Sequence, residues 1–182
     1  MPSLMRLRVK VDNGTGELVK LQARGCLDGR RWEDDSPTTT NTLPPEGLRF
    51  LAGEAAMQQR VIVVGDVVNA YPKSGWGVHH DGTPRLVFMS MFKGFERYRA
   101  DGELMMYRLD NALYGAPPSG HCFELHLVKA FEAAGGVRSR AIPALFSIPT
   151  AAASVRAGTI VDDLLLTAPR TPEGERVLRH AM

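Results

Sequence analysis

The chain has 182 residues, of which 44% are hydrophobic and 23% charged, and its formal net charge is +2. This composition is ordinary for a soluble globular protein and gives no global basic signal for nucleic acid, although it is compatible with a local basic groove. The two cysteines form no CxxC pair, which argues against a zinc knuckle or a disulfide scaffold, and there is neither a membrane-length apolar run nor a signal-peptide core. We therefore expect an intracellular protein, cytoplasmic or nuclear and not secreted, with no membrane partner.

The first 60 residues predict a basic hairpin, a loop and a helix. Apolar and basic residues alternate over 4–11 and 18–25, on either side of the turn sequence DNGTGE, and this pattern is typical of a β-hairpin. Residues 26–42 are polar and predict a loop. In 43–60 the two prolines suit a helix start, and the Leu and Ala side chains that follow share one helical face.

The middle of the chain predicts three strands. The run VIVV (61–64) predicts a buried strand that continues into Gly65 and Asp66. After a loop at 71–84, the segments RLVFMSM (85–91) and LMMYRL (104–109) predict two more strands around a polar connector.

The last third of the chain predicts a helix and then several strands. Residues 117–136 have an apolar helical face and end in two glycines, which indicates a helix. PALFSIP (143–149) predicts a strand, and TIVDDLLLT (159–167) predicts two short strands with its two acids at or near the bend. The final TPEGERVLRHAM indicates the start of another helix. Because strands and helices mix without strict βαβ alternation, we expect an α+β fold with an antiparallel sheet.

The aspartates are the candidate chemical groups. Asp66 ends one apolar strand, and Asp162 and Asp163 interrupt another. If these strands are neighbours, the carboxylates converge, and a pair of Mg²⁺ ions commonly holds such a cluster because hard cations take oxygen ligands. Two metals can activate an attacking hydroxyl and stabilise a leaving pyrophosphate. The alternative is a solvated turn in which Asp makes local hydrogen bonds, and the residue pattern alone leaves both interpretations open.

Five segments follow one another in a recognisable order. They are VKVDNGTGELVKLQARG (9–25), GDVVNAY (65–71), VFMSMFKGF (87–95), YRLDNALYG (107–115) and IVDDLLL (160–166). In order and spacing they resemble the reverse transcriptase of copia-type LTR retrotransposons. The corresponding segments of that family are its fingers hairpin, D-V-K-T-A-F, V-Y-M-x-x-P-x-G-F, C-K-L-x-K-A-L-Y-G and Y-V-D-D-L-L-L, and the resemblance covers nearly the whole chain.

The resemblance implies a fold and a domain organisation. It implies the palm of a right-hand polymerase, an antiparallel sheet with helices on one face, together with fingers. The fingers would comprise residues 1–60 and the palm residues 61–182, with a fingers-side excursion at about 72–103. The thumb would be largely missing.

The resemblance also implies an activity. This is RNA-directed DNA polymerisation, the transfer of dNTPs to a primer 3′ end on an RNA or DNA template, with two Mg²⁺ ions and Mn²⁺ as an alternative. Asp66, Asp162 and Asp163 would be the catalytic and metal-binding acids, and the carbonyl of Val67 would complete a metal shell. The rest of a retrotransposon polyprotein would be a further partner.

Three more residues take substrate-binding roles from the resemblance. Lys20 and Arg24 match basic fingers positions that meet the triphosphate or the template, and solvated charges are the alternative. Tyr71 lies five positions after Asp66, where the family has an aromatic gate that clashes with a ribose 2′-OH. The alternative for Tyr71 is a plain core aromatic.

Two segments differ from the family pattern. Ile160 replaces an aromatic residue before the two acids, and APPSGHCF (116–123) replaces the segment that carries a template-positioning Gln. These differences support an alternative, a truncated or decayed retroelement copy that keeps the fold and is catalytically inactive. A structural or interaction α+β domain unrelated to polymerases is the remaining hypothesis.

Overall fold

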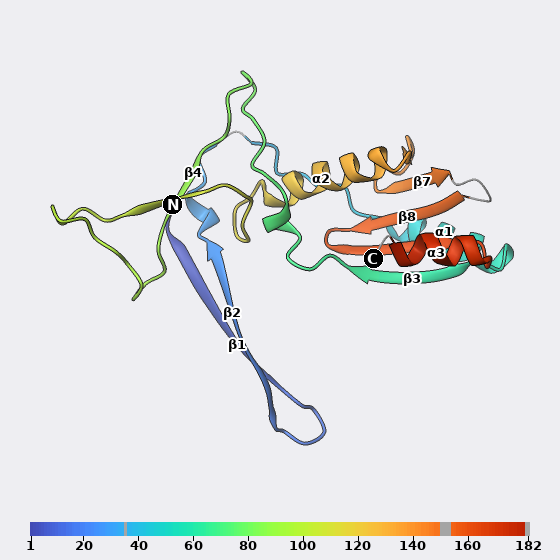
Figure 1. Ribbon diagram of the computed structural model, residues 1–182, viewed down its shortest axis with the longest axis horizontal. Helices are drawn as coiled ribbons and strands as arrows, with labels where there is room; N and C mark the ends of the chain where they lie inside the picture. Colours follow the sequence, from blue (N-terminus) through green and yellow to red (C-terminus); the bar gives the residue numbers. More distant parts are fainter. Residues whose placement is uncertain (35, 150–153, 181–182) are drawn as a thin grey trace. The chain divides into compact units, whose positions relative to one another are not determined.

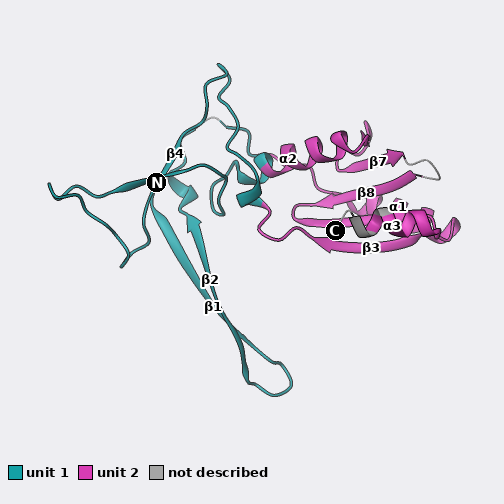
Figure 2. Cartoon of the chain, in the orientation of Figure 1, with its two compact units in different colours: residues 1–38, 71–122 teal, residues 39–70, 123–182 magenta. Residues whose placement is uncertain are grey.

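The computed structural model describes residues 1–34, 36–149 and 154–180, and the chain divides into two compact units (Figure 2). Unit 1 comprises residues 1–38 and 71–122, and unit 2 comprises residues 39–70 and 123–182. The described residues form three α-helices and three antiparallel sheets, so the predicted α+β class is confirmed. No helix among them has the length and apolar character needed to cross a membrane.

Unit 1 is built from hairpins and loops. Its strands are β1 (Ser3–Val11), β2 (Leu18–Leu27), β4 (Val87–Ser90) and β5 (Met106–Leu109), and its short 3-10 turns are η1 (Gly29–Arg31) and η2 (Tyr71–Lys73). Strands β1 and β2 pair as the predicted basic hairpin, which projects from the rest of unit 1 (Figure 2). The core of the unit gathers around Trp76 and Leu27, whose side chains are almost fully buried.

Unit 2 contains a five-stranded antiparallel sheet in the order β3-β9-β8-β7-β6 (Figure 1). The strands are β3 (Val61–Asp66), β6 (Val137–Arg138), β7 (Leu145–Pro149), β8 (Ser154–Ile160) and β9 (Asp163–Ala168). The helices are α1 (Pro45–Met57), α2 (Ser119–Ala133), whose residues from Phe123 onward belong to this unit, and α3 (Pro172–His180). The elements predicted from 143–149 and 159–167 are confirmed as β7, β8 and β9.

Helices cover both faces of this sheet, which corrects the prediction of helices on one face. Successive strand residues point to opposite faces. Leu164 and Leu166 of β9 pack in one apolar cluster with residues of α2 and α3, whereas Leu165 packs in another with Leu51 of α1. The physical reason is that the β9 run is apolar at consecutive positions, so each face of the strand needs its own cover.

Strand β3 is at the edge of the sheet, and the prediction that it is buried was wrong. Ile62 and Val64 are 45% and 69% exposed, while the alternate residues Val61 and Val63 pack toward α2 and α3. An apolar run cannot by itself distinguish a central strand from an edge strand. Helix α1 lies in unit 2, so the observed units differ in their boundaries from the fingers of residues 1–60, which stay a prediction.

Candidate functional sites: an acidic sheet end and, separately, a basic hairpin

Two of the predicted acids face each other across neighbouring strands. Asp66 is the last residue of β3, Asp163 is the first residue of β9, and the two are direct partners in the antiparallel register. Directly paired residues have Cα atoms about 4.5–5.5 Å apart and project on the same side of the sheet. The register therefore places both carboxylates on the face that α1 also covers, since Leu165 lies two residues after Asp163.

The third acid lies in the turn that joins β8 to β9. The Val67 N–H donates to the Asp162 carbonyl at 2.9 Å, which ties the turn to the chain leaving β3. Val161 adopts a φ of 57°. This left-handed conformation is a genuine outlier for a β-branched residue, and costs of about 1–3 kcal/mol are typical of such strain. The turn that contains Asp162 therefore has a backbone conformation that the local preference of Val161 does not explain.

The carboxylates escape the burial cost that their apolar flanks suggest. Asp66 and Asp163 are exposed and Asp162 is half-buried, whereas Leu164 and Leu166 are buried. Within the described part of the chain, none of the three side chains makes a hydrogen bond or an ion pair. The exposed carboxylates of Asp66 and Asp163 therefore avoid the desolvation cost of burial, and the repulsion between them is the unfavourable contribution to stability that is left.

The donor set at this end suits a hard divalent cation in part. Asp66 and Asp163 supply carboxylate oxygens from one face, and Mg²⁺ is commonly bound through one or two carboxylates plus substrate phosphates. Residues 1–34, 36–149 and 154–180 contain no cluster of three or more His, Cys, Asp or Glu side chains arranged to hold a metal. The structure thus brings two predicted acids together as a facing pair, with Asp162 linked to them through the backbone.

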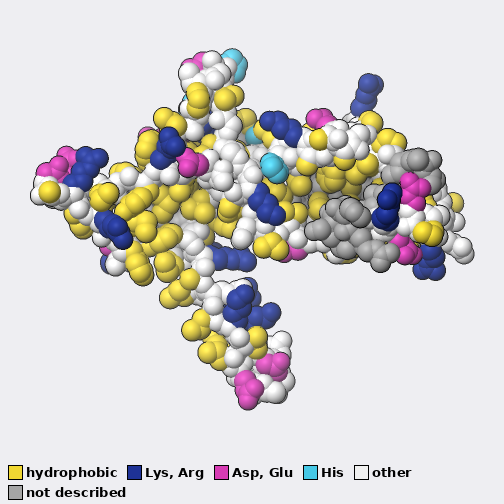
Figure 3. Space-filling view, viewed as in Figure 1, with side chains coloured by type: hydrophobic (Ala, Val, Ile, Leu, Met, Phe, Trp, Pro, Cys, Tyr) yellow, Lys and Arg dark blue, Asp and Glu magenta, His cyan; other side chains and the backbone are white. Residues whose placement is uncertain are grey.

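The hairpin of unit 1 has one cationic face. Its register places Arg6 opposite Arg24 and Lys10 opposite Lys20, with Arg8 between these pairs and opposite Gln22. The alternate positions, among them Leu7 opposite Ala23, form an apolar face. Figure 3 shows basic and hydrophobic side chains together along the hairpin, with acidic ones near its tip.

The cationic face combines predicted and overlooked residues. The sequence predicts Lys20 and Arg24 as binding residues, and the register of the hairpin adds Arg6, Arg8 and Lys10 to the same face. The alternation of residue types and the turn position already contained this information, since together they determine the register. Like charges that face each other across strands are destabilising, so the face is electrostatically suited to a polyanion.

The predicted gate residue lies in an aromatic contact within unit 1. Tyr71 is in η2, and its ring centroid is 4.9 Å from that of Tyr114. The guanidinium carbon of Arg24 is 5.8 Å from the centroid of the same Tyr114 ring. Two predicted substrate-binding residues are thus joined by a third that the sequence interpretation treated only as part of a motif.

Comparison of the chain with family models, with curated proteins and with solved structures finds no match.

Proposed function

We propose that the chain is a reverse transcriptase domain of a copia-like retrotransposon, which transfers dNTPs to a primer 3′ end on an RNA or DNA template. The observation that carries the proposal is the facing pair Asp66 and Asp163, at the end of adjacent antiparallel strands, with Asp162 in the strained turn beside them. Asp66 and Asp162 are 96 positions apart in the sequence. The sheet of unit 2 would be the palm and the hairpin of unit 1 part of the fingers.

Under this proposal, each candidate residue would have a role in metal binding or in substrate binding. Asp66, Asp162 and Asp163, with the Val67 carbonyl, would hold two Mg²⁺ ions, which supply activation of the primer hydroxyl and neutralise charge on the phosphates. The three carboxylates make no hydrogen bond or ion pair among the described residues, which supports this role, because the facing carboxylates of Asp66 and Asp163 gain most from a cation. Lys20 and Arg24 would meet the triphosphate or the template strand, and such contacts make binding salt-dependent.

A primer-extension assay tests the proposal. Purified protein receives poly(rA) primed with oligo(dT), together with dTTP and either Mg²⁺ or Mn²⁺. We expect extension by the unaltered protein and its loss, by at least about 10²-fold, in Asp162→Asn and Asp66→Asn, because charge neutralisation in the transition state is the main catalytic contribution.

Asp110→Asn is the matched control, since this carboxylate of unit 1 is 74% exposed and pairs with Arg108. The control should extend the primer as the unaltered protein does. Extension that is unchanged in Asp162→Asn would refute the assignment of the acids.

The second candidate is a catalytically inactive copy that keeps the fold and binds nucleic acid. It is favoured by the donor set, which comprises two facing carboxylates and not a cluster of three in the described residues. Under this alternative the protein binds primed poly(rA) through the hairpin and does not extend it. Binding is measured by fluorescence anisotropy, and the variant Arg6→Glu/Arg8→Glu tests whether the cationic face carries it, with Leu7→Ser on the opposite face as control.

A further inference from the structure

Tyr114 lies between two residues that the proposed function assigns to nucleotide binding. Its ring is 4.9 Å from the Tyr71 ring, centroid to centroid, and 5.8 Å from the guanidinium carbon of Arg24. Tyr71 and Tyr114 are half-buried and Arg24 is exposed. A ligand can therefore reach this group of three side chains.

The backbone holds Tyr114 against the root of the hairpin. The Leu27 N–H, at the end of β2, donates to the Tyr114 carbonyl at 2.7 Å. Gly115 follows with a φ of 90°, and a Cβ at this position would lie 2.1 Å from the Leu27 carbonyl oxygen. A Cβ on Gly29 would in turn lie 2.1 Å from the Gly115 carbonyl oxygen. Glycine at 115 thus permits a close approach that no other residue allows, and this approach places the Tyr114 ring beside Arg24, three residues before Leu27.

Tyr71 is tied to the same segment from the other side. Its carbonyl accepts hydrogen bonds from the Ser74 N–H at 2.9 Å and from the Ser74 hydroxyl at 2.8 Å. The Ser74 carbonyl accepts from the Ala112 N–H at 2.8 Å. These bonds tie the backbone of residues 71–74 to residue 112, close in sequence to Tyr114, and so bring the two tyrosines into one neighbourhood.

We infer that Tyr114 is a positioning residue for nucleotide selection, an inference that rests on the proposed polymerase function. It holds the Tyr71 ring, which meets the sugar, in a fixed relation to the Arg24 guanidinium, which meets the triphosphate. A guanidinium is suited to phosphate oxygens because its donors match them in pairs. An aromatic ring selects against a 2′-OH only if it cannot move aside, and Tyr114 limits that movement. Tyr114 would act through its contacts with Tyr71 and Arg24.

Steady-state kinetics on primed poly(rA) test the inference. We expect Tyr114→Leu to raise KM for dTTP about fivefold, the size of a lost cation–π or ring contact, while kcat stays nearly unchanged. The preference for dTTP over UTP should fall by a similar factor. Tyr114→Phe keeps the ring and should retain both values. A side chain that only supports the fold would lower the active fraction, and so kcat, without altering the preference for the deoxy sugar.

A double-mutant cycle separates the loss of the Arg24–Tyr114 contact from a general folding defect of Tyr114→Leu. Arg24→Gln lies on the exposed hairpin and should raise KM by itself, and adding Tyr114→Phe should change nothing further. In the cycle with Tyr114→Leu, KM for dTTP in the double variant should be no higher than in the single variant with the higher KM, because both substitutions break the same Arg24–Tyr114 contact.

The outcomes separate this inference from the proposed function. If the unaltered protein does not extend the primer, the proposed function fails and the inference fails with it. If the unaltered protein extends the primer but Tyr114→Leu leaves KM and the dTTP preference unchanged, or if Tyr114→Phe behaves as Tyr114→Leu does, only the inference about Tyr114 is refuted.

Discussion

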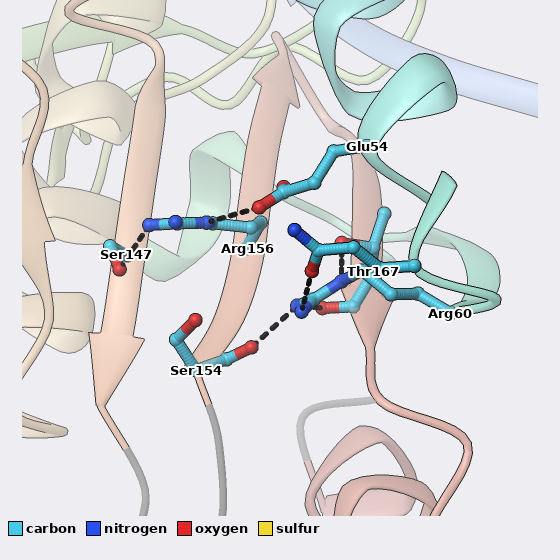
Figure 4. A network of polar contacts seen from close by, with 7 residues as sticks. Glu54, Arg60, Ser147, Ser154, Arg156 and Thr167 are labelled. Atoms are coloured by element: carbon cyan, nitrogen blue, oxygen red, sulfur yellow. Dashed lines mark hydrogen bonds and ion pairs between the residues drawn. The ribbon is translucent and has the colours of Figure 1, made fainter. Parts of the chain in front are cut away.

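The α1 face of the sheet in unit 2 has charged groups at both of its ends, and the two ends treat charge in opposite ways. At one end Asp66 and Asp163 face each other without any partner among the described residues. At the other end, four residues along β9 and so about 13 Å away, the guanidinium of Arg60 binds Thr167, and Arg156 binds Glu54 (Figure 4).

Each arginine at this end has several partners, while one of the two Glu54 carboxylate oxygens is buried without a hydrogen-bond partner among the described residues. Arg60 donates to the Thr167 hydroxyl at 3.2 Å and to the Thr167 carbonyl at 3.1 Å, and it reaches the Ser154 carbonyl as well. Arg156 lies 3.4 Å from a Glu54 carboxylate oxygen and donates to the Ser147 hydroxyl at 2.6 Å. These contacts connect the end of α1 to three strands, so this end contributes to the stability of the fold.

The two ends differ in whether their charges are paired within the described residues. A protein that gains stability from paired charges at one end of a sheet leaves like charges unpaired at the other end, at a cost. Such a cost is commonly retained where a ligand offsets it. The contrast predicts opposite responses to substitution and to cations at the two ends.

The largest expected effect is at the arginine end. Arg60→Met keeps much of the apolar stem and removes the guanidinium, which leaves the Ser154 and Thr167 carbonyls without this donor. We expect a loss of about 2–3 kcal/mol in the free energy of unfolding, because the donor is charged and partly buried. Urea unfolding measures it, and Arg49→Met on the exposed side of α1 is the control, with an expected change within about 0.5 kcal/mol. Equal losses in both variants would contradict the structural role of the arginine end.

A divalent cation should stabilise the acidic end. If Mn²⁺ binds the folded protein at Asp66 and Asp163, a concentration ten times its Kd adds about 1.4 kcal/mol to the free energy of unfolding. We expect the thermal midpoint to rise with Mn²⁺ in the unaltered protein and in Asp110→Asn. The rise should be absent in Asp66→Asn/Asp163→Asn. A rise of the same size in that double variant would place the cation elsewhere.

Glu124 is a carboxylate that is paired with an arginine, as Glu54 is at the arginine end. It is 12% exposed and accepts hydrogen bonds from the Asn41 N–H and side-chain amide, and Arg138 pairs with it. Burial acts to raise the pKa of Glu124, but the Asn41 and Arg138 contacts outweigh it and hold the pKa below its ordinary value. A lowered pKa gives stability that is present above the unfolded value, about 4.3, and is lost as the pH falls through the folded value.

Glu124→Gln should therefore be less stable than the unaltered protein at pH 7, and the difference should shrink below about pH 4 as the native carboxylate takes up a proton. Urea unfolding at pH 7, 5, 4 and 3 measures this dependence. A difference that stays constant down to pH 3 would show that the ionised carboxylate is not what stabilises this site.

The sequence predicted local structure better than it predicted neighbours. Alternation and turn residues were sufficient for the hairpin, and the acids interrupting an apolar run were sufficient for the β8–β9 bend. They could not show that β3 is an edge strand, because Ile62 and Val64 are apolar and exposed. Nor could they place α1 opposite α2 and α3, since that depends on which strand face each helix finds.

The candidate site shows the same limit. Asp66, Asp162 and Asp163 were found from strand ends, and the structure adds the facing register of the outer two. Tyr114 could not be found in this way, because its contacts with Arg24 and Tyr71 join three segments distant in the sequence. The only local signal was the glycine that follows it, whose requirement becomes clear from the Leu27 carbonyl beside it.

The smallest expected effect is also the one that best separates the two ends. Asp66→Asn removes one of two facing like charges, so without divalent cations it should raise the free energy of unfolding by up to about 0.5 kcal/mol. The gain should fade in 1 M salt, where the screening length drops to about 3 Å. Asp163→Asn should match it, and the double variant should gain little more, because one substitution already removes the repulsion. A loss of stability in either single variant would mean that the carboxylates hold structure, as the arginine end does, and the distinction between the two ends would then fail.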